Sequence, residues 1–380
     1  MIVGFLADKI PYETRRGWGV YSCQLLKALL SVDTKNAYRC FYNLFLRGRR
    51  DLVLNVDQSN LENVVWPIPG RIMDLIWERL RLLPVESFLG NVDLLHVPYE
   101  FLPRARSART VVTVHDVTFL KHPEQLPPAF VRLHTQRIKR ITERADGIIA
   151  ISESTKRDLL EFTGVAEERV RVILPGVARY LRPIKDKASI SAVSERYGIG
   201  GSYLLYVGAA DEDKNLVRLA SAFSAIRKDY PGLKLVLAGS LEWGFDRLME
   251  RLAAMNITDD IILTGFVAGD DLPALYSGAR LLAIPSIHEG FGLPALEAMA
   301  CGTPVLSSNV ASLPEVVGDA GVLVDPYSVE AIEKGVRSLL EDALFAETCG
   351  RIGLERAQRF TWEATAKQVI SFYEELCESR

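Results

Sequence analysis

Residues 288–297 read His-Glu-Gly-Phe-Gly-Leu-Pro-Ala-Leu-Glu, which places two carboxylates, Glu289 and Glu297, on either side of a glycine turn that leads into a helix. The two glycines have no Cβ, so the backbone of the turn can approach a ligand closely. Pro294 suits the start of the helix, whose free N–H groups and positive end favour an anion such as a diphosphate. A buried turn with one glutamate stabilised by the helix dipole explains the bare spacing equally well. The rest of the sequence decides between these interpretations.

The length and composition predict a globular protein with two domains. The chain has 380 residues, more than one hydrophobic core normally organises, and it is 48% hydrophobic and 24% charged. It has no run of about eighteen apolar residues, and the apolar run 1–7 is too short for a signal peptide, so we expect a cytoplasmic protein. The five cysteines are scattered without C-x-x-C spacing, which predicts neither disulfides nor a zinc site.

The charge is distributed unevenly along the chain. Residues 1–180 contain 26 Lys and Arg against 20 Asp and Glu, whereas residues 181–380 contain 19 against 28. The basic residues of the first half concentrate at 47–50, 104–109 and 137–140. Most such clusters are solvated faces, and the alternative is a surface that contacts anionic lipid. Nucleic acid is disfavoured, because the charge is modest and no nucleic-acid-binding module is recognisable.

Short apolar runs alternate with longer helical patterns from end to end, which predicts an α/β protein with parallel sheets covered by helices. Strands are predicted near 2–7, 38–46, 63–66, 94–97, 111–114, 147–151, 170–173, 203–207, 234–238, 261–263, 281–284, 304–307 and 321–324. Helices are predicted near 20–30, 72–82, 129–144, 153–162, 216–229, 245–254, 270–277, 295–301, 329–341 and 345–359, with a last one ending near 377. The polar stretch 182–201, punctuated by proline and glycine, reads as a linker between two units. Ligands of such sheets bind outside the carboxyl ends of the strands, and two facing units leave a cleft.

Several polar residues follow predicted strands directly. In the second half, Lys214 lies in the loop after strand 203–207, where a lysine suits a phosphate, although a solvated loop lysine is the simpler explanation. Gly208, Gly239 and Gly265 each end a strand, where glycine permits close approach of a ligand or simply makes the turn.

The first half contains two comparable positions. Residues 17–19, Gly-Trp-Gly, follow the first strand, and by themselves they are better explained by a plain turn than by a ligand loop. His115 and Asp116 follow strand 111–114, a position from which α/β proteins often present catalytic groups. By itself, a turn histidine that caps its neighbour is the simpler explanation. We expect packing or loop roles for His96 and His122.

These stretches together resemble family 4 of the retaining glycosyltransferases, which have the GT-B fold. The resemblance rests on residues 289–305, 313–318 and 323–326, and it extends through 206–208, 214–216, 113–116 and 151–156 to 17–19, so that it covers nearly the whole chain. It implies two Rossmann-like domains that face a central cleft. An acceptor-binding domain is expected at 1–182, a nucleotide-sugar donor-binding domain at 183–360, and a C-terminal helix packing on the N-terminal domain at 361–380. Trp362 would then mark the hinge.

The resemblance also implies roles for individual residues. Glu289 and His115 are expected to contact the donor sugar, Glu297 the nucleotide ribose, and Lys214 the donor diphosphate. The catalytic candidates are therefore His115, Lys214 and Glu289. The expected donor-binding residues are Gly17, Gly19, Gly208, Lys214, Gly239, Glu289, Gly290, Phe291, Gly292, Leu293 and Glu297. Trp18 and Asp116 are expected on the acceptor side, and neither a metal nor a cofactor is expected.

One departure from the family pattern concerns the diphosphate. Family members usually carry an arginine where this chain has Ala209 or Asp213, so the second cation is missing from its usual place. Arg218, one helical turn beyond Lys214, is a possible replacement from its i,i+4 spacing. An acidic residue beside the diphosphate would oppose stabilisation of the leaving group unless it turns outward.

The resemblance implies a retaining, metal-independent hexosyltransferase of surface polysaccharide synthesis. GDP-mannose is the first expected donor and a UDP-sugar the second, and the acceptor is a glycan or a lipid-linked acceptor. The basic first half suits peripheral contact with an anionic membrane. A nucleotide-sugar epimerase and a non-catalytic sugar-nucleotide-binding protein of the same fold are the alternatives. A pyridine-dinucleotide enzyme is disfavoured, because no G-x-G-x-x-G follows the first strand.

Overall fold

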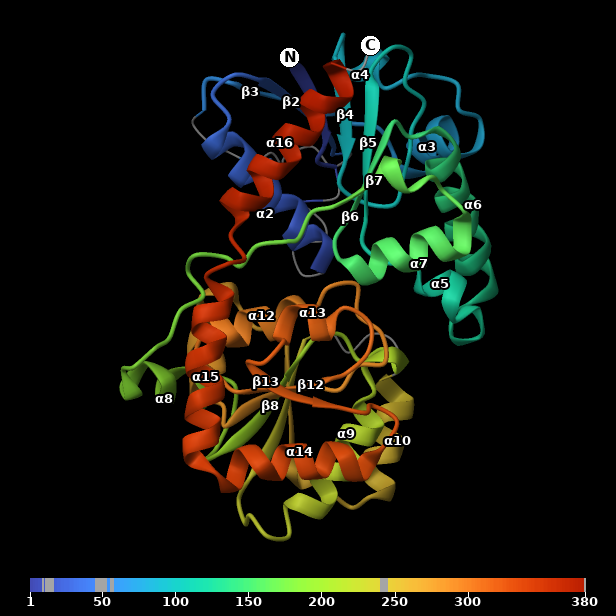
Figure 1. The fold of residues 1–380 in the computed structure, drawn as a ribbon. Coiled ribbons are helices and arrows are strands. Elements are labelled where there is room, and N and C mark those ends of the chain that lie inside the picture. The colour runs from blue at the N-terminus through green and yellow to red at the C-terminus, as the bar shows by residue number, and fades with distance from the viewer. Residues whose placement is uncertain (9, 11–16, 45–52, 55–57, 240–244, 379–380) are drawn as a thin grey trace. The chain divides into compact units, whose positions relative to one another are not determined.

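The computed structural model describes residues 1–8, 10, 17–44, 53–54, 58–239 and 245–378 (Figure 1). The chain forms two compact units: unit 1 comprises Met1–Gly176 together with Thr361–Arg380, and unit 2 comprises Val177–Phe360. The first division falls after Gly176 rather than after residue 182, because the backbone N–H of Val177 already donates to the Phe360 carbonyl at 3.0 Å within unit 2.

Unit 1 is built on a seven-stranded parallel sheet with the order β3-β2-β1-β4-β5-β6-β7. Its strands are β1 (Ile2–Leu6), β2 (Ala37–Asn43), β3 (Leu61–Trp66), β4 (Leu94–Val97), β5 (Arg109–Val114), β6 (Gly147–Ala150) and β7 (Val170–Val172). β4 and β6 are buried along their whole length, as expected for strands covered on both faces, which is why they read as continuous apolar runs. The strand order reverses between β1 and β4.

The helices of unit 1 include one that returns from the end of the chain. They are α2 (Gly17–Val32), α3 (Gly70–Asp74), α4 (Glu86–Leu89), α5 (Thr118–Lys121), α6 (Pro128–Arg144), α7 (Glu153–Thr163) and α16 (Trp362–Glu378). α16 packs against α2, as Figure 1 shows, and the Thr365 hydroxyl donates to the Leu174 carbonyl at 2.7 Å. Trp362 is buried and its ring meets that of Tyr21 edge to face at 5.5 Å. The C-terminal helix therefore belongs to the core of unit 1.

Unit 2 repeats the plan with a six-stranded parallel sheet in the order β10-β9-β8-β11-β12-β13. The strands are β8 (Tyr203–Val207), β9 (Lys234–Ala238), β10 (Ile261–Gly265), β11 (Leu281–Ile284), β12 (Val305–Ser308) and β13 (Gly321–Val324). The helices are α8 (Lys187–Arg196), α9 (Leu216–Ile226), α10 (Phe245–Ala254), α11 (Leu272–Gly278), α12 (Leu293–Ala300), α13 (Leu313–Val317), α14 (Val329–Glu341) and α15 (Ala343–Ala357). Its strand order reverses between β8 and β11. Two Rossmann-like units with parallel sheets confirm the predicted α/β class.

Two sequence predictions about elements were wrong. The stretch 182–201 is not a linker, because it contains α8, which is capped by Asp186 and packs against α11 inside unit 2. The predicted helix 72–82 is divided into α3 and a π-helix, Leu75–Arg79, after which Arg81 adopts a positive φ of 50°.

Candidate functional site

The strand order of unit 2 brings two loops together at one edge of its sheet. Ligands of α/β sheets bind outside the carboxyl ends of the strands where the order reverses, which here is between β8 and β11. The loop after β8 carries Lys214 in a short 3₁₀ turn, and the loop after β11 carries Glu289. The backbone N–H of Ile287 donates to the Asp213 carbonyl at 2.7 Å, so the two loops are joined directly.

Lys214 lies between two carboxylates. Its Nζ is 3.1 Å from Glu289 Oε1 and 3.0 Å from Asp213 Oδ2, and all three side chains are largely shielded from solvent. Burial opposes the charge of the ammonium, but the charges of Glu289 and Asp213 outweigh it and hold the pKa of Lys214 well above its usual value. Asp213 therefore does not turn outward, and this trio of charged groups carries one net negative charge when all are ionised.

Two buried serines hold Glu289 in place. The Ser286 hydroxyl donates to Glu289 Oε1 at 2.9 Å, and the Ser312 hydroxyl donates to the Glu289 carbonyl at 2.8 Å. Both serines are fully buried. Neither contact was predicted, because Ser286 was noted only for its place before the turn and Ser312 comes from a later loop.

The glycine turn after Glu289 leads into α12 as predicted, one or two residues earlier than expected. Gly292 precedes the helix at a φ of 100°, where an added Cβ would come within 2.6 Å of the Leu313 side chain, so glycine is required there. Leu293 is the first helical residue. Phe291 is buried and its ring lies 6.0 Å from that of Phe360, so it anchors the turn in the core of unit 2.

Glu297 lies in the second turn of α12 and contacts a residue that the sequence did not indicate. The hydroxyl of Tyr276, on α11, donates to Glu297 Oε2 at 2.7 Å. Burial raises the pKa of Glu297 to about 7, and the hydrogen bond from Tyr276 partly opposes this rise. The carboxyl group therefore changes its charge near neutral pH.

Asn215 ties several strand ends together beside Lys214. It adopts a positive φ of 62°, which asparagine tolerates, and its amide donates to the carbonyls of Pro285 and Pro326 at 2.9 and 2.6 Å. The guanidinium of Arg218 donates to Asn215 Oδ1 at 2.9 Å and lies over the Tyr327 ring. Arg218 is therefore held at this edge of the sheet through Asn215, whose role the sequence did not reveal.

Close approach of the chain to itself explains two of the strand-end glycines. Gly208 and Gly239 have φ values of 154° and 137°, and a Cβ added to Gly239 would lie 2.0 Å from the Gly208 carbonyl oxygen. The ends of β8 and β9 thus pass each other at a distance that only glycine allows. Gly265 accepts from the Gly239 N–H at 2.8 Å and continues this arrangement along the sheet edge.

In unit 1 the corresponding reversal lies between β1 and β4. Gly17, Trp18 and Gly19 form the first turn of α2, with Gly17 exposed and Gly19 buried. The Trp18 ring lies 5.9 Å from that of Tyr99, which follows β4. Trp18 therefore packs at the predicted edge of the sheet and is partly exposed there.

His115 is fixed at the end of β5 by three contacts. Its Nε2 lies 2.9 Å from the Pro98 carbonyl, so this nitrogen carries a proton, and its ring meets that of Tyr21 edge to face at 4.8 Å. Its backbone N–H donates to Glu100 Oε1 at 2.5 Å. Burial raises the pKa of Glu100, which His115 partly counteracts. Glu100 was missed by sequence reasoning, since it belongs to the loop of another strand.

Two further polar residues of unit 1 make contacts within that unit. Asp116 accepts from the Thr118 N–H at 2.9 Å at the start of α5. His96 is buried between Tyr373 and Thr113, and burial lowers its pKa to about 3, so the expected packing role is confirmed.

The basic clusters are partly neutralised where the structure describes them. Arg109 pairs with Asp146 at 2.6 Å, while Arg137 and Arg140 share Glu78. The cluster 47–50 lies outside the described residues. Among those described, no group of side chains could hold a metal ion and no helix has the length and apolar character needed to span a membrane.

Comparison with known proteins identifies the class. Residues 44–179 match the family model described as Glycosyltransferase Family 4, and residues 194–374 match that described as Glycosyl transferases group 1. O-antigen chain mannosyltransferase B of Escherichia coli is 31% identical over 389 aligned positions, which cover 98% of this chain and 99% of that protein. The chain therefore belongs to the family 4 glycosyltransferases with the GT-B fold, as the sequence predicted.

Solved structures agree on the fold. Sucrose-phosphate synthase from Thermosynechococcus elongatus superposes with a TM-score of 0.79 at 23% identity, over 100% of both chains. The Anabaena protein HepE, solved in complex with UDP-glucose, superposes with a TM-score of 0.75 at 18% identity, over 99% of this chain and 100% of that one.

Proposed function

We propose that this glycosyltransferase moves a hexosyl group, with mannose as the first candidate, from a nucleoside diphosphate sugar to a glycan or lipid-linked acceptor. The name of the Escherichia coli relative supports mannose and a role in polysaccharide synthesis. The UDP-glucose bound to HepE supports a nucleotide-sugar donor in this fold. GDP-mannose is the first donor to test and a UDP-sugar the second. Retention at the anomeric carbon, independence of metal ions and a cytoplasmic site of action belong to the same proposal.

The pairing of Lys214 with Glu289 at the strand reversal of unit 2 carries this proposal. A donor at this edge would place its diphosphate against Lys214 and the free N–H groups at the start of α12. Glu289 would accept hydrogen bonds from sugar hydroxyls, and Glu297 from the ribose. The backbone of Gly208, Gly239, Gly290 and Gly292 would lie along the donor at the same edge. The acceptor would bind to unit 1, where Trp18 and Asp116 are the candidate contacts. Gly17, Gly19 and His115 remain candidates for contact with the donor.

Charge balance explains why the diphosphate needs more than Lys214. Departure of the leaving group places negative charge beside Asp213 and Glu289, which already neutralise the lysine. The second cation would be Arg218, held at the same edge through Asn215. Arg218 would thus supply the second positive charge in place of the arginine that is absent at Ala209 and Asp213.

A panel of GDP-, UDP-, ADP- and dTDP-sugars tests the proposal through thermal shift and product analysis by mass spectrometry. We expect GDP-mannose to stabilise the protein most and to yield a transferred hexose with the anomeric configuration of the donor. Lys214→Ala should reduce the thermal shift, while Lys228→Ala, an exposed lysine of the same unit, should retain it in full. Stabilisation by none of these donors would overturn the proposal.

A non-catalytic nucleotide-sugar-binding protein is the second candidate, favoured by one contact. Asp213 lies 3.0 Å from the lysine that would otherwise face the diphosphate. Donor binding without hydrolysis or transfer, together with turnover in Asp213→Asn alone, would favour this candidate. The matched families and the Escherichia coli relative are glycosyltransferases and give no support to the epimerase alternative.

A further inference from the structure

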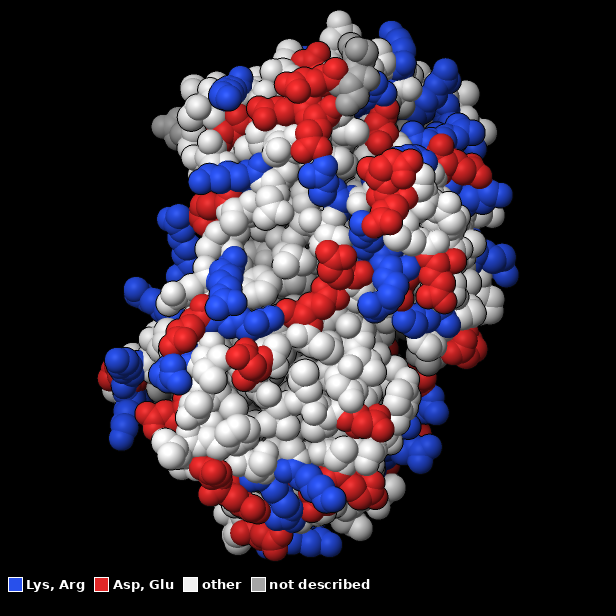
Figure 2. Space-filling view, in the orientation of Figure 1, with Lys and Arg blue, Asp and Glu red and all other residues white. Residues whose placement is uncertain are grey.

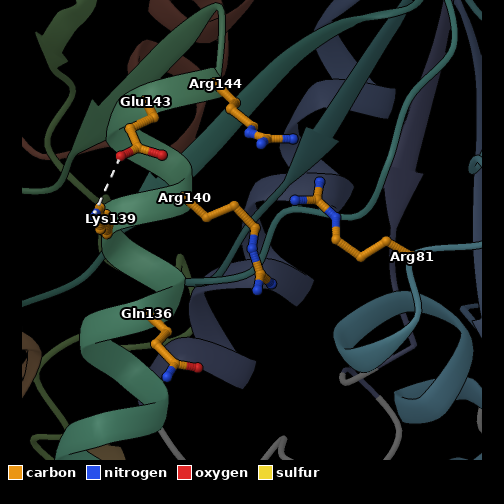
Figure 3. Close-up of a pocket in the computed structure, with 6 residues that line it drawn as sticks. All are labelled: Arg81, Gln136, Lys139, Arg140, Glu143 and Arg144. Carbon is orange, nitrogen blue, oxygen red and sulfur yellow. Dashed lines mark ion pairs between the residues drawn. The ribbon is translucent and has the colours of Figure 1, made fainter.

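Unit 1 contains a cavity of about 300 Å³ that is lined mainly by basic side chains. Its lining residues are Arg81, Gln136, Lys139, Arg140, Glu143 and Arg144 (Figure 3). All except Arg81 project from α6, and Figure 3 shows the side chains of Arg140 and Arg144 extending from that helix toward Arg81. Three guanidinium groups thus converge on one cavity.

Nearby carboxylates do not balance this charge. Glu78 pairs with Arg137 and Arg140 at 3.1 and 3.0 Å, and Glu143 pairs with Lys139 at 3.9 Å. Arg81 and Arg144 form no close ion pair within the described parts of the chain, although the charge of Glu78 acts on Arg81 from a longer distance. Burial and the charges of Arg140 and Arg144 lower the pKa of Arg81, and they outweigh the opposing charge of Glu78. The cavity therefore has the charge to receive an anion.

The backbone that presents Arg81 is strained. Arg81 has a positive φ of 50°, which side chains other than glycine adopt at a cost, and it follows directly on a π-helix. Both features concentrate at functional sites, because folding alone does not favour them.

Exposed apolar side chains surround the same position. Leu80, Leu82 and Leu83 are 52%, 59% and 43% exposed, and Ile72 and Leu75 on the preceding turns are 47% and 42% exposed. Exposure of several large apolar side chains in one segment is unfavourable in water. A basic cavity beside exposed leucines is complementary to a lipid bilayer, which has anionic headgroups at its surface and apolar acyl chains beneath them.

We propose that this docking surface, formed by the cavity and Leu80–Leu83, binds the face of an anionic phospholipid bilayer. A lipid phosphate enters the cavity, where the guanidinium groups donate hydrogen bonds to its oxygens. The leucines insert among the acyl chains. Figure 2 shows Lys and Arg side chains gathered along the side of unit 1 that carries α3 and α6. The inference rests on the lipid-linked acceptor proposed above and names the surface that would bring the enzyme to it.

Two variants separate the contributions of charge and apolar contact. A basic residue close to an anionic surface contributes about fivefold in binding, which is about 1 kcal/mol, so Arg81→Gln with Arg144→Gln should weaken binding about 25-fold. Leu80→Ser with Leu82→Ser should weaken it by about tenfold or more without changing the charge. The matched control is Lys27→Gln with Lys367→Gln, which removes two exposed charges from α2 and α16, helices that do not line the cavity.

The test is sedimentation of the full chain with vesicles of phosphatidylcholine alone or mixed equally with phosphatidylglycerol. We expect binding to the mixed vesicles only, lost in both cavity and leucine variants and kept in the control. The proposal would be overturned if the wild type did not bind the mixed vesicles, or if the control variant lost as much binding as the cavity variant. Binding of inorganic phosphate in the cavity, together with unchanged sedimentation of the leucine variant, would also overturn the proposal. That result would indicate a site for free phosphate rather than a surface that binds a bilayer.

The same variants distinguish this failure from a failure of the proposed function. Hydrolysis of the donor in solution should be unchanged in the Arg81 and Arg144 variant, because neither residue belongs to the donor site. Normal hydrolysis without vesicle binding rejects the docking surface alone, whereas vesicle binding without hydrolysis of any nucleotide sugar rejects the proposed function. A thermal melting curve for each variant confirms that it is folded.

Discussion

Glu297 leads to a specific prediction about stability and pH. Burial raises its pKa to about 7 in the folded protein, whereas an unhindered glutamate titrates at 4.5. Between these values the folded protein holds a proton that the unfolded chain has released. The folded state binds more protons in this window, so the free energy of unfolding falls as the pH rises from 4.5 to 7 and is level beyond it.

The size of the effect follows from the difference between the two pKa values. Each pKa unit corresponds to about 1.4 kcal/mol, so the difference amounts to about 3 kcal/mol. This figure is an upper value, because Glu297 keeps some contact with solvent and water screens its charge.

Urea unfolding at about pH 4.5 and about pH 8 measures the effect. Glu297→Gln cannot ionise and still accepts from Tyr276, so it should lose this part of the pH dependence and become the more stable protein at the higher pH. The control Glu347→Gln changes an exposed residue of α15 and should follow the wild type. Identical pH profiles for the wild type and Glu297→Gln would refute the reasoning.

Further predictions concern the same edge of unit 2. In urea unfolding, Gly239→Ala should destabilise the protein by about 3 kcal/mol or more, because its Cβ would lie 2.0 Å from a carbonyl oxygen. The control Gly232→Ala also lies at a positive φ but has open space around it, so it should cost about 1 kcal/mol. Asp213→Asn should strengthen donor binding about tenfold in calorimetry by removing a charge beside Lys214, and weaker binding would contradict the charge argument. If the ionised Glu297 binds the ribose, donor affinity should fall about tenfold per pH unit below pH 7 in the wild type but not in Glu297→Gln.

The sheets could be predicted from the sequence because parallel strands covered on both faces are continuous apolar runs. β8, β9 and β11 begin and end where the pattern places them. α8 was missed because only Val193 of its ten residues is buried, so its composition resembles a linker. The signals that could have revealed it are Asp186 as a capping residue and Gly198 at a positive φ after its end. The π-helix at Leu75–Arg79 has no distinct pattern, since its apolar spacing fits an ordinary helix.

The site could be predicted as far as strand topology determines it. Lys214 and Glu289 come together because both follow strands at the reversal of the sheet order, which follows from the α/β pattern. The partners Tyr276 and Glu100 could not be predicted, because each approaches from another helix or loop whose position depends on side-chain packing. The pairing of Asp213 with Lys214, rather than with solvent, likewise depends on the burial of the loop.

Turnover of the best donor by Lys214→Ala tests the central claim most directly, with Lys228→Ala as the control. The account predicts that Lys214→Ala lowers the rate of nucleotide release by about 100-fold or more, and that donor affinity falls less than turnover, because the ammonium acts most strongly on the departing diphosphate. The control should stay within about twofold of the wild type. Equal turnover in Lys214→Ala and the wild type would contradict the placement of the donor at the Lys214 and Glu289 pair.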